Sequence, residues 1–216
     1  MTITIREPGS ALTHLAAMFL AAGASIPLLL KAAGMGGVYV AVMLVFAASM
    51  ILLYGASAFY HAIDLAPAVI KVFRKLDHSM IFILIAGSYT PVCILVLERA
   101  VGIPLLVTVW SFAIIGILLK VFWINCPKWL SSTIYIVLGW SVVAVMGPIY
   151  QSLTGSAFAW LLAGGIMYTV GGVIYALKLK VFNDKHPYFG SHEVFHLFVM
   201  AGSFCHFVVM YQYLLQ

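Results

Sequence analysis

The 216 residues include 8% charged and 64% hydrophobic side chains, and the mean hydropathy is +1.12. Soluble domains hold about 25% charged residues, so this composition excludes an ordinary soluble enzyme or binding module and indicates an integral membrane protein. The net charge of +5 does not indicate nucleic-acid binding, because the basic residues are scattered through short segments rather than gathered in one patch.

Seven apolar segments are each long enough to cross a bilayer, which requires about 20 residues. We expect an all-α, seven-helix membrane bundle that forms a single domain over residues 1–216. The expected spans are 10–30, 37–60, 79–97, 102–122, 131–150, 157–177 and 191–214. The first apolar run is longer than the hydrophobic core of a typical signal peptide and contains His14, so we interpret it as a retained helix.

The connection at 61–76 is amphipathic, with apolar residues on one face of a helix and lysine and arginine side chains on the other. This pattern predicts a separate short helix in the membrane interface. Pro91 and Pro148 fall within predicted spans, where neighbouring helices can satisfy the backbone groups that proline frees. Kinks rather than breaks are therefore expected at both prolines.

The basic residues are divided unequally between the two ends of this bundle. Those on the side of the N-terminus are Arg6, Lys71, Arg74, Lys75, Lys120, Lys128, Lys178, Lys180 and Lys185. Lys31 and Arg99 lie on the opposite side. By the positive-inside rule, we expect a multi-pass protein of the cell's inner (plasma) membrane, with a cytoplasmic N-terminus and an external C-terminus.

The last predicted helix contains the sequence SHEVFHLFVMAGSFCHF, in which three histidines interrupt an apolar stretch. Ionisable side chains within a transmembrane segment are costly and mark functional sites. His192 and His196 are one turn apart and share a face with Ser203 and His206, since an α-helix advances about 100° per residue. An i, i+4 pair of imidazoles in a membrane helix favours metal binding.

The order of the spans brings further polar residues to the same membrane depth as this pair. They are Ser57 and His61 at the end of the second span, and Asp77 before the third. Zinc prefers nitrogen and sulfur ligands, and catalytic zinc sites combine three protein ligands with one open position. We therefore predict that His61, His192 and His196 bind Zn²⁺. Asp77 would orient or deprotonate a water, and Ser57 would donate to that water or to an oxyanion.

Several of these residues have a simpler interpretation when each is taken alone. His61 suits an interfacial histidine, Asp77 a residue at a helix start, and Ser57 a helix-packing serine. The same applies to three further histidines, which we expect to be buried hydrogen-bond partners within the bundle: His14, His78 and His206.

The sequence HEVFH, at 192–196, matches the HExxH pattern of zinc proteases. In that pattern the glutamate, here Glu193, is the general base. On a helix Glu193 lies about 100° from His192, so it can equally face solvent or complement the helix N-terminus. A membrane-embedded zinc protease is therefore an alternative interpretation.

Four sequence elements carry a wider resemblance: SAFYH at 57–61, KLDHSMIFILIAGSYTP at 75–91, YIVLGW at 135–140 and HEVFHLFVMAGSFCHF at 192–207. Together they resemble the hemolysin III family, the bacterial branch of the progestin and adipoQ receptor superfamily. The resemblance covers nearly the whole chain and implies a seven-helix bundle with an intracellular N-terminus and a zinc site near the inner leaflet. The ligands it implies are His61, His192 and His196, with Asp77 contacting the metal through water and Ser57 lining the site.

The resemblance also bears on residues outside this group. It implies that Glu193 is not a catalytic base, because related receptors have glutamine at the matching position. Glu7 and His14 fit the acidic-to-histidine opening of the family, but Ser10 stands where an asparagine is usual. The role of this first-helix motif is therefore left open.

The resemblance implies a function that involves membrane lipids. Members of the wider superfamily resemble ceramidases, which implies zinc-dependent hydrolysis of a lipid amide, with Asp77 handling protons and Ser57 assisting the oxyanion. The alternatives are a non-enzymatic sensor or membrane-homeostasis protein with structural zinc, and a haemolytic pore-forming protein. The expected partners are membrane lipids and a lipid amide substrate.

Overall fold

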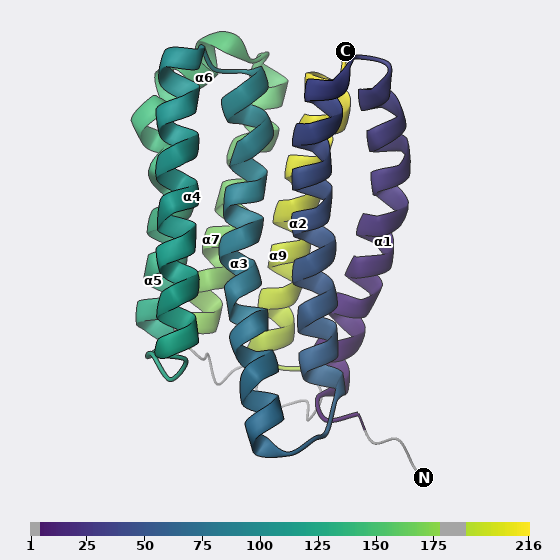
Figure 1. The fold of residues 1–216 in the computed structure, drawn as a ribbon, viewed down its shortest axis with the longest axis vertical. Coiled ribbons are helices and arrows are strands. Elements are labelled where there is room, and N and C mark those ends of the chain that lie inside the picture. Colours follow the sequence, from purple (N-terminus) through teal and green to yellow (C-terminus); the bar gives the residue numbers. More distant parts are fainter. Residues whose placement is uncertain (1–4, 178–188) are drawn as a thin grey trace.

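The computed structural model describes residues 5–177 and 189–216, which form an elongated bundle of helices (Figure 1). In chain order these are α1 (Pro8–Ala33), α2 (Gly37–Ala62), α3 (Pro67–Leu95), α4 (Arg99–Phe122), α5 (Lys128–Gly139), the 3₁₀ helix η1 (Trp140–Val145), α6 (Met146–Ser152), α7 (Gly155–Leu177), α9 (Ser191–Val208) and the π-helix η2 (Val209–Leu214). Counting α5 to α6 and α9 to η2 as single spans, seven segments of the described chain are long and apolar enough to cross a membrane. The predicted all-helical, seven-span membrane fold is confirmed.

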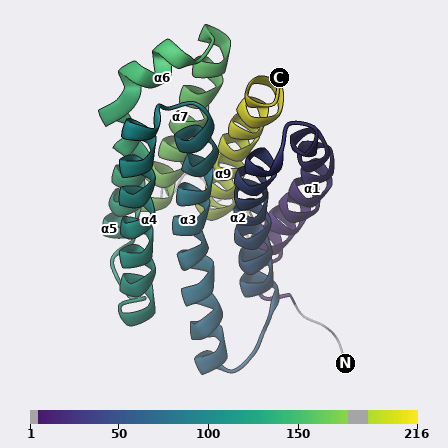
Figure 2. The same ribbon diagram turned by 45° about the horizontal axis from the view of Figure 1, so that its top comes forward.

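Helices that follow one another in the chain pack together along the first half of the bundle. α1 packs on α2, α2 on α3 and α3 on α4, while α9 packs against α7 and α1. Two views agree that α3 lies between a group formed by α1, α2 and α9 and a group formed by α4, α5 and α7 (Figures 1 and 2). The beginning of the chain is therefore in contact with the last helix.

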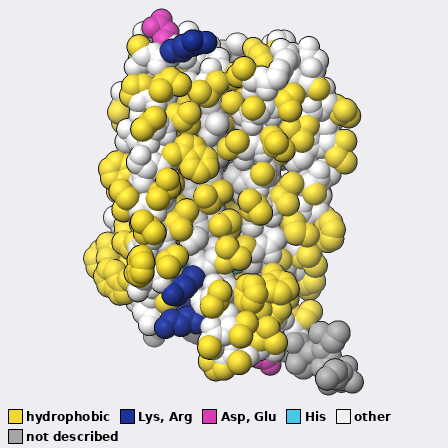
Figure 3. Space-filling view, viewed as in Figure 1, with side chains coloured by type: hydrophobic (Ala, Val, Ile, Leu, Met, Phe, Trp, Pro, Cys, Tyr) yellow, Lys and Arg dark blue, Asp and Glu magenta, His cyan; other side chains and the backbone are white. Residues whose placement is uncertain are grey.

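The outside of the bundle suits lipid contact. Hydrophobic side chains cover the middle of the face in Figure 3, and the charged side chains visible there lie near the two ends. Leu20 is 67% exposed and Leu30 is 71% exposed, although both are large and apolar. Such exposure is expected where the surrounding solvent is hydrocarbon rather than water.

Close contact between α7 and α9 depends on glycines in both helices. A Cβ atom added at Gly164 of α7 would overlap the His206 ring, and one added at Gly202 of α9 would overlap the Tyr168 ring. Each helix therefore supplies a glycine opposite an aromatic side chain of the other. Small residues of this kind allow close helix approach in membranes.

The third span begins earlier than the sequence analysis predicts. α3 runs without interruption from Pro67, so the expectation of a separate interfacial helix in the 61–76 connection is wrong. Proline is favoured in the first helical turn. After Pro67 no glycine or proline occurs before Gly87, so nothing in the sequence stops the helix near its start. The helix continues through Pro91 to Leu95 without a break, as expected.

The fifth span is interrupted, which contradicts the expectation of a simple kink at Pro148. Its α-helical geometry gives way to the 3₁₀ helix η1 before that proline, which lacks an N–H donor and crowds the preceding turn. Tyr89 of α3 satisfies the altered backbone. Its hydroxyl donates to the carbonyl oxygen of Gly139 at 2.6 Å and accepts from the N–H of Val142 at 2.8 Å.

The N-terminus and C-terminus lie at opposite ends of the bundle (Figure 1). The end of α2 and the start of α9 lie at the N-terminal end, as the order of spans predicts. The basic residues Lys178, Lys180 and Lys185, which contribute to the predicted topology, lie outside the described residues. The orientation of the two ends relative to the membrane remains a prediction.

Candidate metal centre

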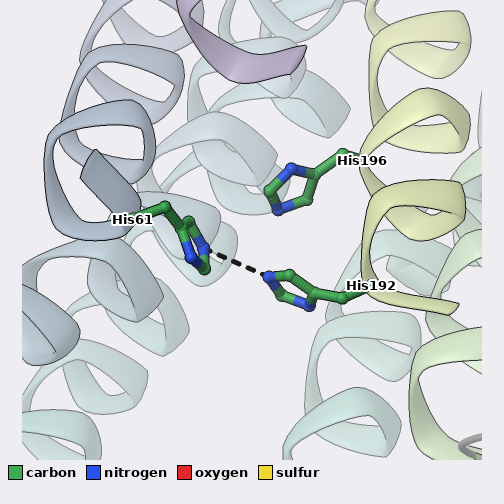
Figure 4. Close-up of side chains that lie close together, drawn as sticks. All are labelled: His61, His192 and His196. Carbon is green, nitrogen blue, oxygen red and sulfur yellow. Dashed lines mark hydrogen bonds between the residues drawn. The ribbon is translucent and has the colours of Figure 1, made fainter. Parts of the chain in front are cut away.

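Three histidines come together at the N-terminal end of the bundle (Figure 4). His61 lies in the last turn of α2, and His192 and His196 lie in the first two turns of α9. One ring nitrogen from each lies within 4.8 Å of the other two. The Nε2 atoms of His61 and His192 are 3.1 Å apart. The grouping of these three side chains agrees with the prediction from span order and helix spacing.

The donor set fits a first-row transition-metal ion. Tetrahedral zinc has Zn–N distances of about 2.0–2.1 Å, which places two ligand nitrogens about 3.3 Å apart. The 3.1 Å separation between His61 and His192 is close to this value. His61 and His196 are also almost fully buried, so a bound cation would replace water contacts with imidazole nitrogens. This group can therefore hold a metal ion.

Asp77 and Ser57 lie beside the histidine group, and both are buried. Both residues line a cavity that His192 and His196 also line. The structure thus places a carboxyl group and a hydroxyl group next to the histidines, while the roles predicted for them remain predictions.

The cavity has a volume of about 130 Å³ and extends into the bundle. At the histidine end its lining includes Asp77 and Ser57, and further along α9 it includes His206. Apolar side chains form most of the wall, among them Leu53 and Phe195. A polar site therefore opens onto an apolar chamber within the membrane-spanning part of the protein.

Glu193 does not face this cavity as a free carboxylate. One carboxylate oxygen accepts the backbone N–H of Gly190 at 2.7 Å, and the other accepts the hydroxyl of Ser10. The side chain therefore caps the start of α9 and connects it to α1. These contacts give Glu193 a structural role and do not support the HExxH protease alternative.

The start of α1 contributes contacts that the sequence analysis did not predict. The Glu7 carboxylate is hydrogen-bonded to Nδ1 of His61, and this bond lowers the pKa of Glu7 below its usual value. The Thr13 hydroxyl is 3.1 Å from Nδ1 of His196. Glu7 stands out in the sequence as an acidic residue just before an apolar span, but nothing there indicates its contact with His61, and nothing distinguishes Thr13.

Three histidines were expected to be hydrogen-bond partners. His206 and His14 differ in outcome, and for His78 the expectation remains a prediction. Nε2 of His206 pairs with the carbonyl oxygen of Leu161 at 3.3 Å, as predicted. For His14 the prediction is wrong, because neither ring nitrogen has a hydrogen-bond partner among the described residues. His14 instead stacks on His196, so packing rather than hydrogen bonding determines its position.

Comparison with known proteins identifies the family. A family model described as "Haemolysin-III related" matches residues 3–207. The chain belongs to the haemolysin III family. The resemblance inferred from the four sequence elements is therefore confirmed, and the haemolysin III fold here is that of a multi-pass membrane protein.

Two bacterial relatives of this haemolysin III protein match along nearly their whole length. Hemolysin-3 of Bacillus cereus is 37% identical, covering 100% of this chain and 95% of that protein. A Hemolysin-3 homolog of Bacillus subtilis (strain 168) is 37% identical, covering 93% of this chain and 91% of its own. The adiponectin receptor protein of Drosophila melanogaster is 26% identical over 63% of this chain and 34% of its own length. Similarity thus extends from bacterial haemolysin III proteins to a eukaryotic receptor.

Proposed function

We propose that this haemolysin III protein is a zinc-dependent hydrolase of a lipid amide at the cytoplasmic leaflet of the inner (plasma) membrane. The observation that carries the proposal is that two members of the three-histidine group, His192 and His196, line a cavity that Asp77 and Ser57 also line. Catalytic zinc sites have three protein ligands and one open position. The same number of ligands is available here, beside a carboxyl group suited to proton transfer.

Asp77 and Ser57 can carry out the proton transfer and the oxyanion stabilisation that amide hydrolysis requires. Zinc, when bound, lowers the pKa of water to about 7 and polarises a carbonyl group. Asp77 accepts a proton from the attacking water as the water oxygen forms a bond to the carbonyl carbon. It then delivers a proton to the leaving nitrogen as the C–N bond breaks. Ser57 donates a hydrogen bond to the carbonyl oxygen as negative charge develops. The products are a carboxylic acid and an amine.

The cavity supports a lipid as the substrate. Its walls are mainly apolar, and it lies within the membrane-spanning part of the bundle. Burial of hydrocarbon is worth about 0.8 kcal/mol per CH₂ group, so an acyl chain in the cavity gains affinity while its amide group lies at the polar end. The apolar wall also excludes competing water from the reacting groups.

A structural or sensory role for the metal is the second candidate. It is favoured by the wide separation of the histidines along the chain. His61 and His192 are 131 residues apart in the chain and belong to different helices. An ion bound between them would join α2 to α9 and stabilise the folded bundle without any turnover. This candidate shares the metal site with the hydrolase but requires no substrate.

One set of variants tests both candidates. Metal content is measured on the purified protein by elemental analysis, and hydrolysis of an N-acyl sphingoid base is followed by release of fatty acid. We expect about one zinc per chain, and we expect Asp77→Asn to retain it while turnover falls at least about 100-fold. His61→Ala should lose both metal and turnover, whereas His206→Gln, which changes a histidine outside the group, should retain the metal.

The outcomes separate the two candidates. Turnover by Asp77→Asn at the rate of the unaltered protein would contradict the hydrolase mechanism. Bound zinc with no turnover on any lipid from a total membrane extract would favour the structural or sensory role. Absence of metal from a protein purified without chelators, and failure to bind added zinc, would reject both.

A further inference from the structure

We propose that the start of α1 forms an outer shell around the metal centre, in which Glu7 and Thr13 are positioning residues for His61 and His196. Each holds Nδ1 of one histidine and so directs Nε2 toward the metal. The inference rests on the metal site of the proposed function and assigns a role to chain segments that the sequence analysis left without one.

The hydrogen bonds of Thr13 determine which nitrogen of His196 carries a proton. The Thr13 hydroxyl lies 2.9 Å from the carbonyl oxygen of Gly9 and 3.0 Å from that of Ser10. Carbonyl oxygens only accept, so the single hydroxyl hydrogen points toward them. At 3.1 Å from Nδ1 of His196, the same oxygen therefore accepts a hydrogen bond from Nδ1–H. Neutral His196 then keeps its free lone pair on Nε2.

Glu7 has the same effect on His61 and is held more firmly. Its carboxylate accepts from Nδ1–H of His61, which leaves the lone pair on Nε2. The backbone N–H of Glu7 also donates to the carbonyl oxygen of His61 at 3.0 Å. Arg6 lies 3.4 Å from the Glu7 carboxylate and 4.4 Å above the Tyr60 ring. The segment before α1 is thus attached to the last turn of α2 at several points.

The Nε2 atom of His61, which carries the lone pair, points in the direction that metal binding requires. Nε2 of His61 is the atom that lies 3.1 Å from His192, inside the three-histidine group. Ligand histidines in metalloproteins commonly donate their second N–H to a carboxylate or another oxygen acceptor, and loss of such a partner weakens metal binding about 10–100-fold. Glu7 and Thr13 supply one acceptor of each type, from a segment that contributes no ligand of its own.

The test measures the zinc affinity of the full-length purified protein by competition with a chromogenic chelator. Glu7→Gln replaces the carboxylate by a neutral and weaker acceptor, and Thr13→Val removes the acceptor altogether. We expect each to raise the zinc Kd about 10–100-fold while binding stays near one ion per chain. Thr13→Ser keeps the hydroxyl and should bind zinc with the affinity of the unaltered protein. The matched controls are Glu98→Gln, at the N-cap of α4, and Thr133→Val, whose hydroxyl bonds only to Trp129 of its own helix among the described residues. Both controls should bind zinc as the unaltered protein does.

A second measurement keeps the proposal testable if Thr13→Val folds poorly. Cobalt(II) replaces zinc as a spectroscopic probe, and its visible absorption bands respond to ligand orientation. The bands of Glu7→Gln should shift, and those of Thr13→Ser should not. Unaltered affinity and unaltered bands in both Glu7→Gln and Thr13→Val would overturn the outer-shell proposal while leaving the metal site intact. Failure of the unaltered protein to bind zinc would instead reject the proposed function together with this inference.

Discussion

The imidazole of His14 lies flat against the imidazole of His196, with ring centroids 3.5 Å apart and ring planes inclined by 10°. The Tyr54 ring packs edge-on against His14 at a centroid distance of 5.2 Å. His14 is only 2% exposed, and its ring nitrogens have no hydrogen-bond partner among the described residues. Its contribution to the three-histidine group is therefore the area and orientation of its ring.

This contact predicts different results for two substitutions of His14. His14→Phe keeps a flat ring against His196 and should largely preserve zinc affinity and the melting temperature. His14→Ala removes the ring, and large-to-small changes at buried positions cost about 2–5 kcal/mol. Thermal denaturation and chelator competition measure the two effects. Equal losses in both variants would indicate that the ring nitrogens, rather than the ring face, are required.

The capping contacts of Glu193 predict that its charge is dispensable. In Glu193→Gln the amide oxygen can accept from Gly190 and the amide N–H can donate to the Ser10 hydroxyl, so the loss of stability should stay within about 1 kcal/mol. Metal content and turnover should be nearly unchanged. A general base would behave differently, since its loss lowers turnover at least about 100-fold. Such a loss in steady-state hydrolysis would revive the HExxH alternative.

Neighbouring glycines of α7 provide a matched test of helix packing. A Cβ atom at Gly164 would overlap the His206 ring, whereas one at Gly165 would have no neighbour within 4 Å. Overpacking costs about 1–3 kcal/mol, so Gly164→Ala should lower the melting temperature in detergent. Gly165→Ala should be neutral or slightly stabilising, because alanine favours a helix over glycine by up to about 1 kcal/mol. Equal melting temperatures for the two variants would contradict the close approach of α7 and α9.

Chelation should destabilise the protein if the three histidines hold a metal. A ligand that binds only the folded state stabilises it by about 2.7 kcal/mol when its free concentration is 100 times Kd. A melting curve recorded with and without a chelator should therefore show a lower transition after metal removal and recovery when zinc is restored. His196→Ala should not respond to either treatment. An unchanged transition in the metal-loaded protein would exclude a stabilising metal.

The cavity predicts the result of a test for pore formation. Its wall is mainly apolar, and such a surface does not favour a continuous file of water across the bilayer. We therefore expect no ionic current and no dye release when the purified protein is reconstituted into liposomes, with a pore-forming peptide as the positive control. Dye release that rises with protein concentration would support the haemolytic alternative instead.

The sequence predicted the seven spans because their hydrophobic lengths leave few alternatives in a bilayer. It predicted the boundary of α3 poorly, because the amphipathic residues after Pro67 can either lie in the interface or extend the helix, and only packing decides between them. The 3₁₀ segment before Pro148 was also missed. Its backbone groups are satisfied by Tyr89, which lies on another helix and carries no local signal.

The histidine group was predictable for a different reason. The i, i+4 spacing of His192 and His196, together with the order of spans, limits which polar residues can meet. The contacts of Thr13 and Glu7 are not limited in this way. They depend on how the start of α1 rotates against α2 and α9, and many surface threonines and glutamates have the same local sequence character.

The position of α9 in the chain has a consequence for biosynthesis. Two of the three histidines leave the ribosome only after the six preceding spans, so a nascent chain halted before Ser191 holds a single member of the group. The three-histidine group can therefore form only once the final span has been inserted and has docked beside α1. Metal acquisition would then report that insertion has been completed.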